Sequence, residues 1–187
     1  MKDQLKELLQ HSVVIDKGVV DRRTKWMANG IILNKDNNDD TRTDEKIYID
    51  TLSGVICEVG VAMLCGSLNE QVFDHKTRDT YAWDVWSRLK LKNRLEVKLH
   101  KEEWYTFYPN KVKTMIKNIE HHAFDYLVTA NYIEEDDYYV VTPRLIIEPK
   151  TFKFYSTRSQ YAESKTSYYN HRAAVSDGEC IKLFQNK

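Results

Sequence analysis

The chain has 187 residues, of which 42% are hydrophobic, and its 28 basic and 28 acidic side chains give a net charge of zero. This length suits one domain or one domain with extensions. A net charge of zero does not indicate a particular partner, and it is compatible with a basic groove beside an acidic site. Three cysteines without metal-binding spacing indicate reduced thiols, the charged N-terminus does not fit a signal peptide, and no apolar run approaches the roughly 18 residues of a membrane span, so we expect a cytoplasmic protein with no membrane segment.

The first part of the chain predicts two helices separated by a polar loop. Residues 2–10 fit a short amphipathic helix with its leucines inward, and residues 34–46 are almost entirely polar and fit an exposed loop. A long helix is expected over 45–67, with Gly66 as its stop, because apolar residues recur at steps of three and four. The apolar stripe consists of Ile49, Leu52, Ile56, Val59 and Met63.

The middle of the chain predicts a sheet. Its composition predicts strands at 70–76, 80–86 and 93–100, a basic helix at 110–122, and further strands at 124–133 and 137–150. Pro143 indicates a bend or an edge position in the last strand. The order of helix, three strands, helix and two strands predicts an α/β fold with a central mixed β-sheet flanked by helices.

Two strands carry isolated charges. In the stretch RLEVKLH, Glu96 and Lys98 alternate with leucine and valine, so they project side by side from one face of the predicted strand. Asp84 is the only charged residue in YAWDVW, and Asp is a poor strand former. If the strands at 80–86 and 93–100 pair as a hairpin, Asp84 and Glu96 converge.

The long helix holds a third isolated acid. Glu58 is the only charge in VICEVGVAML, at the shoulder of the apolar stripe. A carboxylate there is at least partly desolvated, which costs several kcal/mol unless it is paired. Three acids and a lysine on neighbouring elements suit metal-dependent phosphodiester hydrolysis, because Mg²⁺ takes a few carboxylates plus waters and lowers the pKa of bound water.

These residues resemble a known family. Asp84, an interval of twelve residues and the triplet Glu96-x-Lys98 are similar to the signature of the PD-(D/E)XK nuclease superfamily, although Trp83 stands where that name expects Pro. The resemblance covers roughly residues 45–148 and implies a restriction-endonuclease-like core of order αβββαβ.

The resemblance also implies roles. Asp84 and Glu96 would be metal ligands, the carbonyl of Val97 a third ligand, Lys98 the catalytic lysine, and Glu58 an auxiliary acid that supports a second metal or orients ligands. The cofactor would be Mg²⁺, with Mn²⁺ as a substitute. The expected activity is that of a DNA endonuclease of a restriction or phage DNA-degrading type, acting in the cytoplasm (the host cytoplasm if phage-encoded) and able to form a homodimer that cuts both strands.

The resemblance divides the chain into three parts. Residues 1–43 would be an N-terminal extension, 44–150 the nuclease core, and 151–187 a C-terminal extension. The last part interleaves tyrosines with basic residues, a pattern that suits contacts to phosphates and stacking on unpaired bases.

Several alternatives stay open on the sequence alone. The chain has five acid-x-Lys triplets, and Glu148–Lys150, with Asp125 in a preceding strand, is the rival of Glu96–Lys98. The Glu96–Lys98 pair could be a surface ion pair worth about 0–1 kcal/mol. The function could be that of a non-catalytic nucleic-acid-binding protein on the same fold, or of a non-nuclease α/β protein in which Glu58 is a buried ion-pair partner. His100 shares the face of Lys98 and could lie near the site.

Overall fold

The structure is a computed structural model that describes residues 2–36, 40–67, 85–86, 93–100, 124–158 and 167–183. The predicted strand at 70–76, the predicted basic helix at 110–122 and Asp84 lie outside these residues. In chain order the elements are α1 (Lys2–Leu8), β1 (Val13–Asp16), α2 (Lys17–Leu33), α3 (Asp44–Leu64), β2 (Val85–Trp86), β3 (Arg94–Leu99), β4 (Tyr126–Glu134), β5 (Tyr138–Ile147), α5 (Pro149–Tyr155), β6 (Ser156–Arg158), β7 (Ser167–Tyr169), α6 (His171–Ser176) and β8 (Cys180–Lys182).

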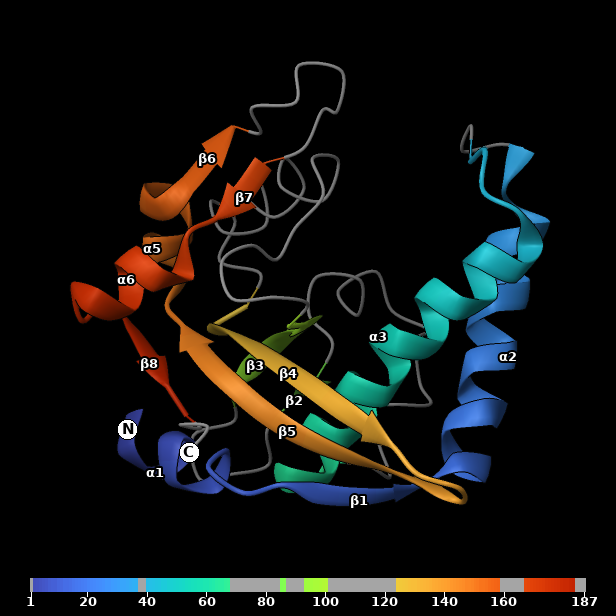
Figure 1. Ribbon diagram of the computed structural model, residues 1–187, viewed down its shortest axis with the longest axis horizontal. Helices are drawn as coiled ribbons and strands as arrows, with labels where there is room; N and C mark the ends of the chain where they lie inside the picture. Colours follow the sequence, from blue (N-terminus) through green and yellow to red (C-terminus); the bar gives the residue numbers. More distant parts are fainter. Residues whose placement is uncertain are drawn as a thin grey trace.

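A mixed sheet forms the centre of the molecule (Figure 1). Its strands are ordered β1-β5-β4-β3-β2, and β8 also pairs with β5. Strands β3 and β4 run parallel, whereas the other pairs within this sheet are antiparallel. With helices packed against it, this sheet confirms the predicted α/β fold.

Each face of the sheet has its own apolar cluster. The larger cluster lies beneath α3 and includes Leu5 and Leu9 from the N-terminal helix region together with the inward side chains of β3 and β5. The smaller cluster joins Leu127 of β4 to Phe152 of α5 and Ala174 of α6 on the other face. Figure 1 accordingly shows α2 and α3 on one side of the strands and α5 and α6 on the other.

The long predicted helix is confirmed as α3. Thr43 caps its start by accepting a hydrogen bond from the backbone N–H of Lys46. Just after its end, Gly66 adopts a φ of 67°, a left-handed conformation that favours glycine and commonly terminates helices. The predicted stripe is only partly right, because Ile49 is 47% exposed while Val61, outside the stripe, is fully buried.

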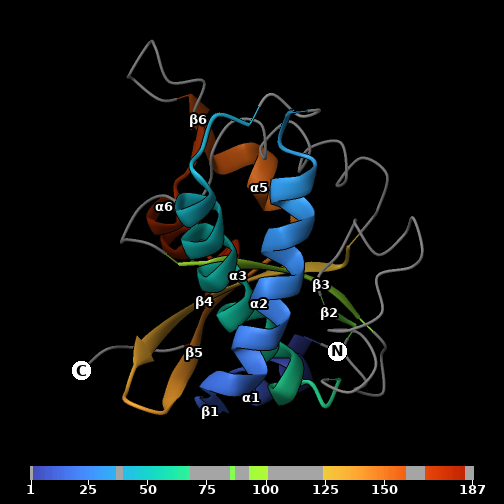
Figure 2. The ribbon, with the colours of Figure 1, turned by 90° about the vertical axis from the view of Figure 1, so that its right-hand side faces the viewer.

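The burial of α3 follows from its position between the sheet and α2, which runs alongside it (Figure 2). Among the described helices, α3 is the one long and apolar enough to span a membrane by length and composition. Packing against the sheet accounts for these apolar side chains, since a core helix passes the same test.

The N-terminal part of the chain contributes directly to the sheet. Strand β1 pairs antiparallel with β5, joining Val13 to Val141. Asp16 then caps α2 by accepting hydrogen bonds from the backbone of Gly18 and Val19. The division of the chain into extensions and a core stays a prediction, but the sheet draws on residues from both sides of the proposed boundary.

Pro143 occupies a gap in the pairing of β5. On one edge of β5, β1 reaches as far as Val141 and β8 begins at Leu145. On the other edge, Pro143 faces Ala130 of β4 beside a register shift in which Arg144 of β5 is the extra residue. A proline, which has no N–H to donate, is therefore accommodated inside a central strand at a local edge beside an irregularity.

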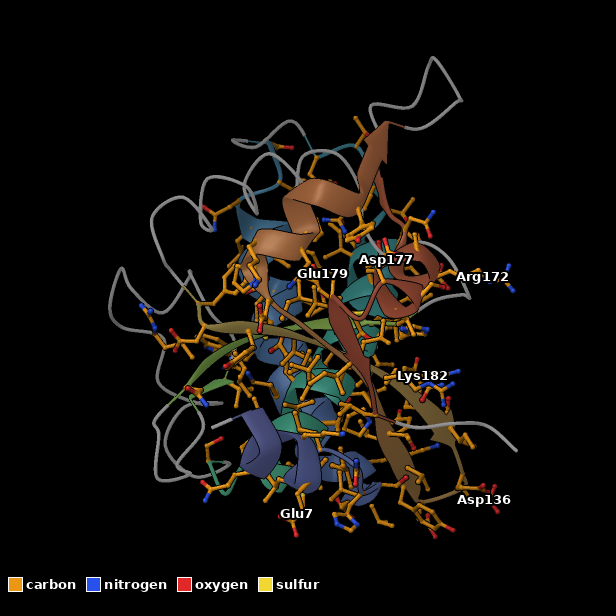
Figure 3. The ribbon with its side chains drawn as sticks, turned by 90° about the vertical axis from the view of Figure 1, so that its left-hand side faces the viewer. Glu7, Asp136, Arg172, Asp177, Glu179 and Lys182 are labelled. Atoms are coloured by element: carbon orange, nitrogen blue, oxygen red, sulfur yellow. The ribbon has the colours of Figure 1, made fainter. Side chains whose placement is uncertain are left out.

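Figure 3 views the molecule from the side of α5 and α6. Arg172 projects away from α6, and Asp177 and Glu179 lie where α6 leads into β8. Asp136, at the turn between β4 and β5, lies far from them. The charged ends of these elements therefore sit on different parts of the surface.

Candidate active site

Strand β3 sends its two kinds of side chain to opposite faces of the sheet. Leu95 and Val97 belong to the cluster beneath α3. Glu96 and Lys98 therefore point to the other face. The parallel register agrees, because it aligns Glu96 with Leu127, a member of the second cluster.

Glu96 and Lys98 form an ion pair that is largely shielded from water. The Lys98 ammonium contacts Glu96 Oε1, and the side chains are 20% and 12% exposed, respectively. Lys98 Nζ also donates a hydrogen bond of 2.9 Å to the carbonyl oxygen of Val97. The structure thus brings two of the predicted metal ligands, Glu96 and the carbonyl of Val97, to the ammonium of Lys98.

Glu58, the third predicted acid, lies on α3 and is half-buried. Burial raises the pKa of the neighbouring Cys57 thiol, the negative charge of Glu58 raises it further, and the positive charge of Lys98 lowers it. Both charges thus act on this thiol, but α3 packs against the face of β3 that carries Leu95 and Val97, which is the face opposite to Glu96 and Lys98. Cys57 itself donates from Sγ to the carbonyl of Ala130 in β4, at 3.4 Å.

The pairing partner of β3 supports the predicted hairpin. Strand β2 pairs antiparallel with β3, joining Val85 to Leu95 and Trp86 to Arg94. Asp84 precedes Val85 in the chain but lies outside the described residues, so its role stays a prediction.

Beyond Lys98, the end of β3 is held by β4. The backbone N–H of His100 donates to the carbonyl of Ala130 at 2.7 Å. The ring nitrogen Nδ1 of His100 lies 3.0 Å from Thr129 Oγ1, within hydrogen-bond distance. Thr129 is fully buried and is aligned with Lys98 in the parallel register. Sequence reasoning missed Thr129, because only the register between the two strands places it beside Lys98.

The rival triplet has different surroundings. Glu148 and Lys150 form an ion pair of 3.0 Å, with the lysine side chain 74% exposed. Asp125, its proposed partner, instead accepts hydrogen bonds from the backbone N–H and the guanidinium of Arg94, at 2.7 and 3.0 Å.

A third triplet, Asp44-x-Lys46, is not paired within itself. Asp44 binds Lys35 and Lys46 binds Asp50. Among the triplets that the structure describes, Glu96–Lys98 is the one in which both charges are shielded. This burial argues against the alternative of an ordinary surface ion pair at 96–98.

The oxygens around Lys98 fit a hard cation. The carboxylate of Glu96 and the carbonyl of Val97 both turn toward the Lys98 ammonium. Within the described residues, no group of three or more His, Cys, Asp and Glu side chains is placed to hold a metal ion. Mg²⁺ needs only one or two carboxylates, because it retains several waters.

Fold and site together define an α/β protein with a shielded acid–lysine pair on an inner strand of a mixed sheet. The family model described as bacteriophage T4 endonuclease IV matches residues 4–171, which is most of the chain. The protein belongs to this family, and its class is therefore that of a nuclease. No curated protein and no solved structure matches the chain.

Proposed function

We propose that the protein is a Mg²⁺-dependent endonuclease that hydrolyses phosphodiester bonds in DNA at the polar face of β3. The shielded Glu96–Lys98 pair carries this proposal. A charged pair removed from water is costly to maintain for stability alone. Because the chain belongs to an endonuclease family, a catalytic role would explain why such a pair is present.

The order of the elements supports the same proposal. Helix α3 precedes β2 and β3, which pair antiparallel, and β4 then runs parallel to β3. A parallel return requires a crossover connection of about a dozen residues or more. The interval between β3 and β4 is long enough for one and includes the predicted helix at 110–122. The described elements α3, β2, β3 and β4 fit their places in the αβββαβ core that the sequence resemblance implies, while the predicted strand at 70–76 and the predicted helix at 110–122 lie outside the described residues.

The proposed ligands of the metal are Asp84, Glu96 and the carbonyl of Val97, with Glu58 as an auxiliary acid. Bound Mg²⁺, for which Mn²⁺ could substitute, would polarise the scissile phosphate and lower the pKa of a bound water.

Lys98 would supply the positive charge that acts on the attacking water or on the phosphate. Its ammonium reaches two of the proposed ligand oxygens from the same strand. From this position it can orient the attacking water or stabilise charge that develops on the phosphate. Its partly shielded surroundings strengthen either interaction, because electrostatic attraction grows as the effective dielectric constant falls.

Cleavage of plasmid DNA in Mg²⁺ tests the proposal. Glu96→Gln and Lys98→Met should each reduce cleavage by about 10²–10⁴-fold, the usual range for a group acting on the proton transfers of the reaction. Glu148→Gln and Lys150→Met form the matched control, because they alter an acid-x-Lys triplet whose lysine is exposed. They should cleave as the unaltered protein does.

Three results would separate the alternatives. Unaltered cleavage by both Glu96→Gln and Lys98→Met would refute the proposed site. DNA binding without cleavage at any Mg²⁺ or Mn²⁺ concentration would support a binding protein on the same fold. Cleavage of RNA but not DNA would change the substrate while leaving the site in place. Light scattering with and without DNA tests the proposed homodimer.

A further inference from the structure

We propose that His100, with its ring held by Thr129, binds the backbone phosphate next to the scissile one and so fixes the register of the DNA over Glu96 and Lys98. This inference rests on the proposed function. It adds a substrate-positioning residue to the face that performs the cleavage.

The position of His100 along the strand carries the first step. In extended backbone, alternate residues share a face and lie about 6.6 Å apart. Glu96, Lys98 and His100 therefore form a row along one face of β3 and its continuation. That spacing is comparable to the separation of successive phosphates along a nucleic-acid strand. A phosphate over Glu96 and Lys98 would thus have a neighbour near His100.

The direction of the Lys98 side chain carries the second step. Lys98 Nζ contacts Glu96 Oε1 and the carbonyl of Val97, both of which precede it in the strand. Its charge is therefore directed toward the Glu96 side of the row. His100 lies beyond Lys98 on the opposite side, where a different donor is needed for the next phosphate.

The fixation of the imidazole carries the third step. Thr129 Oγ1 lies 3.0 Å from His100 Nδ1, and Thr129 is fully buried. The backbone of His100 is held as well, through its N–H to the carbonyl of Ala130. With Nδ1 accepting from the Thr129 hydroxyl, Nε2 carries the ring proton and can donate to a phosphate, and such donors position a protein on nucleic acid. Ordering the ring before binding reduces the entropy lost when the DNA arrives.

An irregularity of the sheet lies at the same place. The register of β4 against β5 shifts between Thr129 and Ala130, the two residues that hold His100. Such β-bulges redirect side chains and are frequent beside active sites. The extra residue is Arg144 of β5, which lies opposite the peptide that joins Thr129 to Ala130.

The test uses variants that separate the two ring nitrogens. Glutamine places its amide nitrogen near the position of Nε2, and asparagine places its amide nitrogen near the position of Nδ1. His100→Ala and His100→Asn should raise KM for a DNA duplex by about 10–100-fold, the range for a hydrogen bond to a charged group. His100→Gln should retain most of the binding. His11→Ala is the matched control, because His11 is exposed and far from β3 in the chain.

A modified substrate identifies the phosphate. The cut is first mapped on a duplex, and the phosphates on either side are then replaced one at a time by an uncharged methylphosphonate. At one of the two neighbouring positions, the replacement should raise KM for the unaltered protein. The same replacement should leave the KM of His100→Ala unchanged. Thr129→Val should show the same pattern with a smaller change, because it frees the ring without removing it.

The outcomes distinguish this inference from the proposed function. If Lys98→Met is inactive but His100→Ala has an unchanged KM, the site stands and the role of His100 is refuted. If the loss in His100→Ala adds to the loss from both methylphosphonates, His100 does not contact either phosphate. If Lys98→Met cleaves normally, the proposed function fails before His100 is considered. Thermal unfolding of each variant is the control that separates these effects from misfolding.

Discussion

At the scale of single residues, the Glu96–Lys98 pair is the feature that most distinguishes this chain. Both side chains are mostly shielded, and they lie on an inner strand rather than at the rim of the sheet. Attraction between shielded charges offsets their desolvation only while both partners are present. Loss of one partner leaves an uncompensated charge.

This reasoning predicts a non-additive effect on stability. Lys98→Met should lower the free energy of unfolding by about 3 kcal/mol, because it leaves the Glu96 carboxylate shielded and without this cation. The double variant Glu96→Gln, Lys98→Met should be more stable than Lys98→Met alone. Urea unfolding of the two single variants and the double variant measures the coupling. Losses that simply add would contradict a coupled pair.

The sequence predicted some of these residues better than others. The alternation in RLEVKLH was enough to place Glu96 and Lys98 on one face, because strand periodicity is a local property. Thr129 belongs to a strand that is separated from β3 by a long connection. Its contact with His100 depends on the parallel register between β3 and β4, which is not encoded locally.

At the scale of elements, the crossing of α3 over β5 depends on one glycine. A Cβ added at Gly60 would lie 2.6 Å from Val141 Cβ, closer than real side-chain contacts allow. Gly60 is buried within the helix, so the close approach of helix and sheet requires its lack of a side chain. The helix as a whole was predictable, but this approach was not, because it depends on the position of β5.

Two glycine substitutions should therefore have opposite effects. Gly60→Ala should destabilise the protein by about 1–3 kcal/mol through overpacking against Val141. Gly30→Ala in α2 should stabilise it by about 0.5–1 kcal/mol, since alanine favours helix and nothing lies within 4 Å of the added Cβ. Thermal unfolding of both variants provides the comparison. A stabilising Gly60→Ala would show that α3 and β5 are less closely packed than described.

The elements that the sequence did not predict have identifiable causes. Helix α2 buries Arg23 and Thr24 together with Val20 and Ala28, while Trp26 and Leu33 are exposed. Its apolar residues therefore mark its inward face only in part. Strand β8 has three residues, too few for a periodic signal. Both elements owe their positions to the partners they pack against, which lie elsewhere in the chain.

The connection from α2 to α3 is tied down by charge. Arg42 forms ion pairs with Asp40 and with Asp50 of α3, the latter at 3.1 Å. Hydrogen bonds from the Arg42 side chain and backbone lower the pKa of the Asp40 carboxyl to about 2. The predicted polar loop therefore has a defined anchor at its C-terminal end.

This anchor predicts a dependence of stability on acid. A carboxyl whose pKa is lowered on folding stabilises the protein above its unfolded pKa of about 4 and loses that contribution as pH falls through its folded pKa. For Asp40 the loss falls between about pH 4 and 2. The thermal midpoints of the unaltered protein and Asp40→Asn should therefore differ at pH 5 and converge toward pH 2. A difference that is constant with pH would contradict the pairing with Arg42.

At the scale of the whole molecule, the sheet separates the larger core cluster from the proposed site. The larger cluster beneath α3 contains much of the described core, whereas Glu96 and Lys98 face the side that α5 and α6 cover in part. The family match spans both sides, since it runs from α1 to the start of α6. The proposed site is thus supported from behind by a packed face, which limits its movement.

If Glu96 helps to bind Mg²⁺, the metal should stabilise the whole fold. A ligand that binds only the folded protein adds about 2.7 kcal/mol at a concentration one hundred times its dissociation constant. Titration with Mg²⁺ in the absence of DNA should therefore raise the thermal midpoint of the unaltered protein. Lys150→Met should respond in the same way, because its exposed side chain lies in the rival triplet. Glu96→Gln should respond much less, since an amide is a weaker ligand than a carboxylate. An equal rise in Glu96→Gln would place the metal elsewhere, because stabilisation by binding depends on affinity for the folded state and not on catalysis.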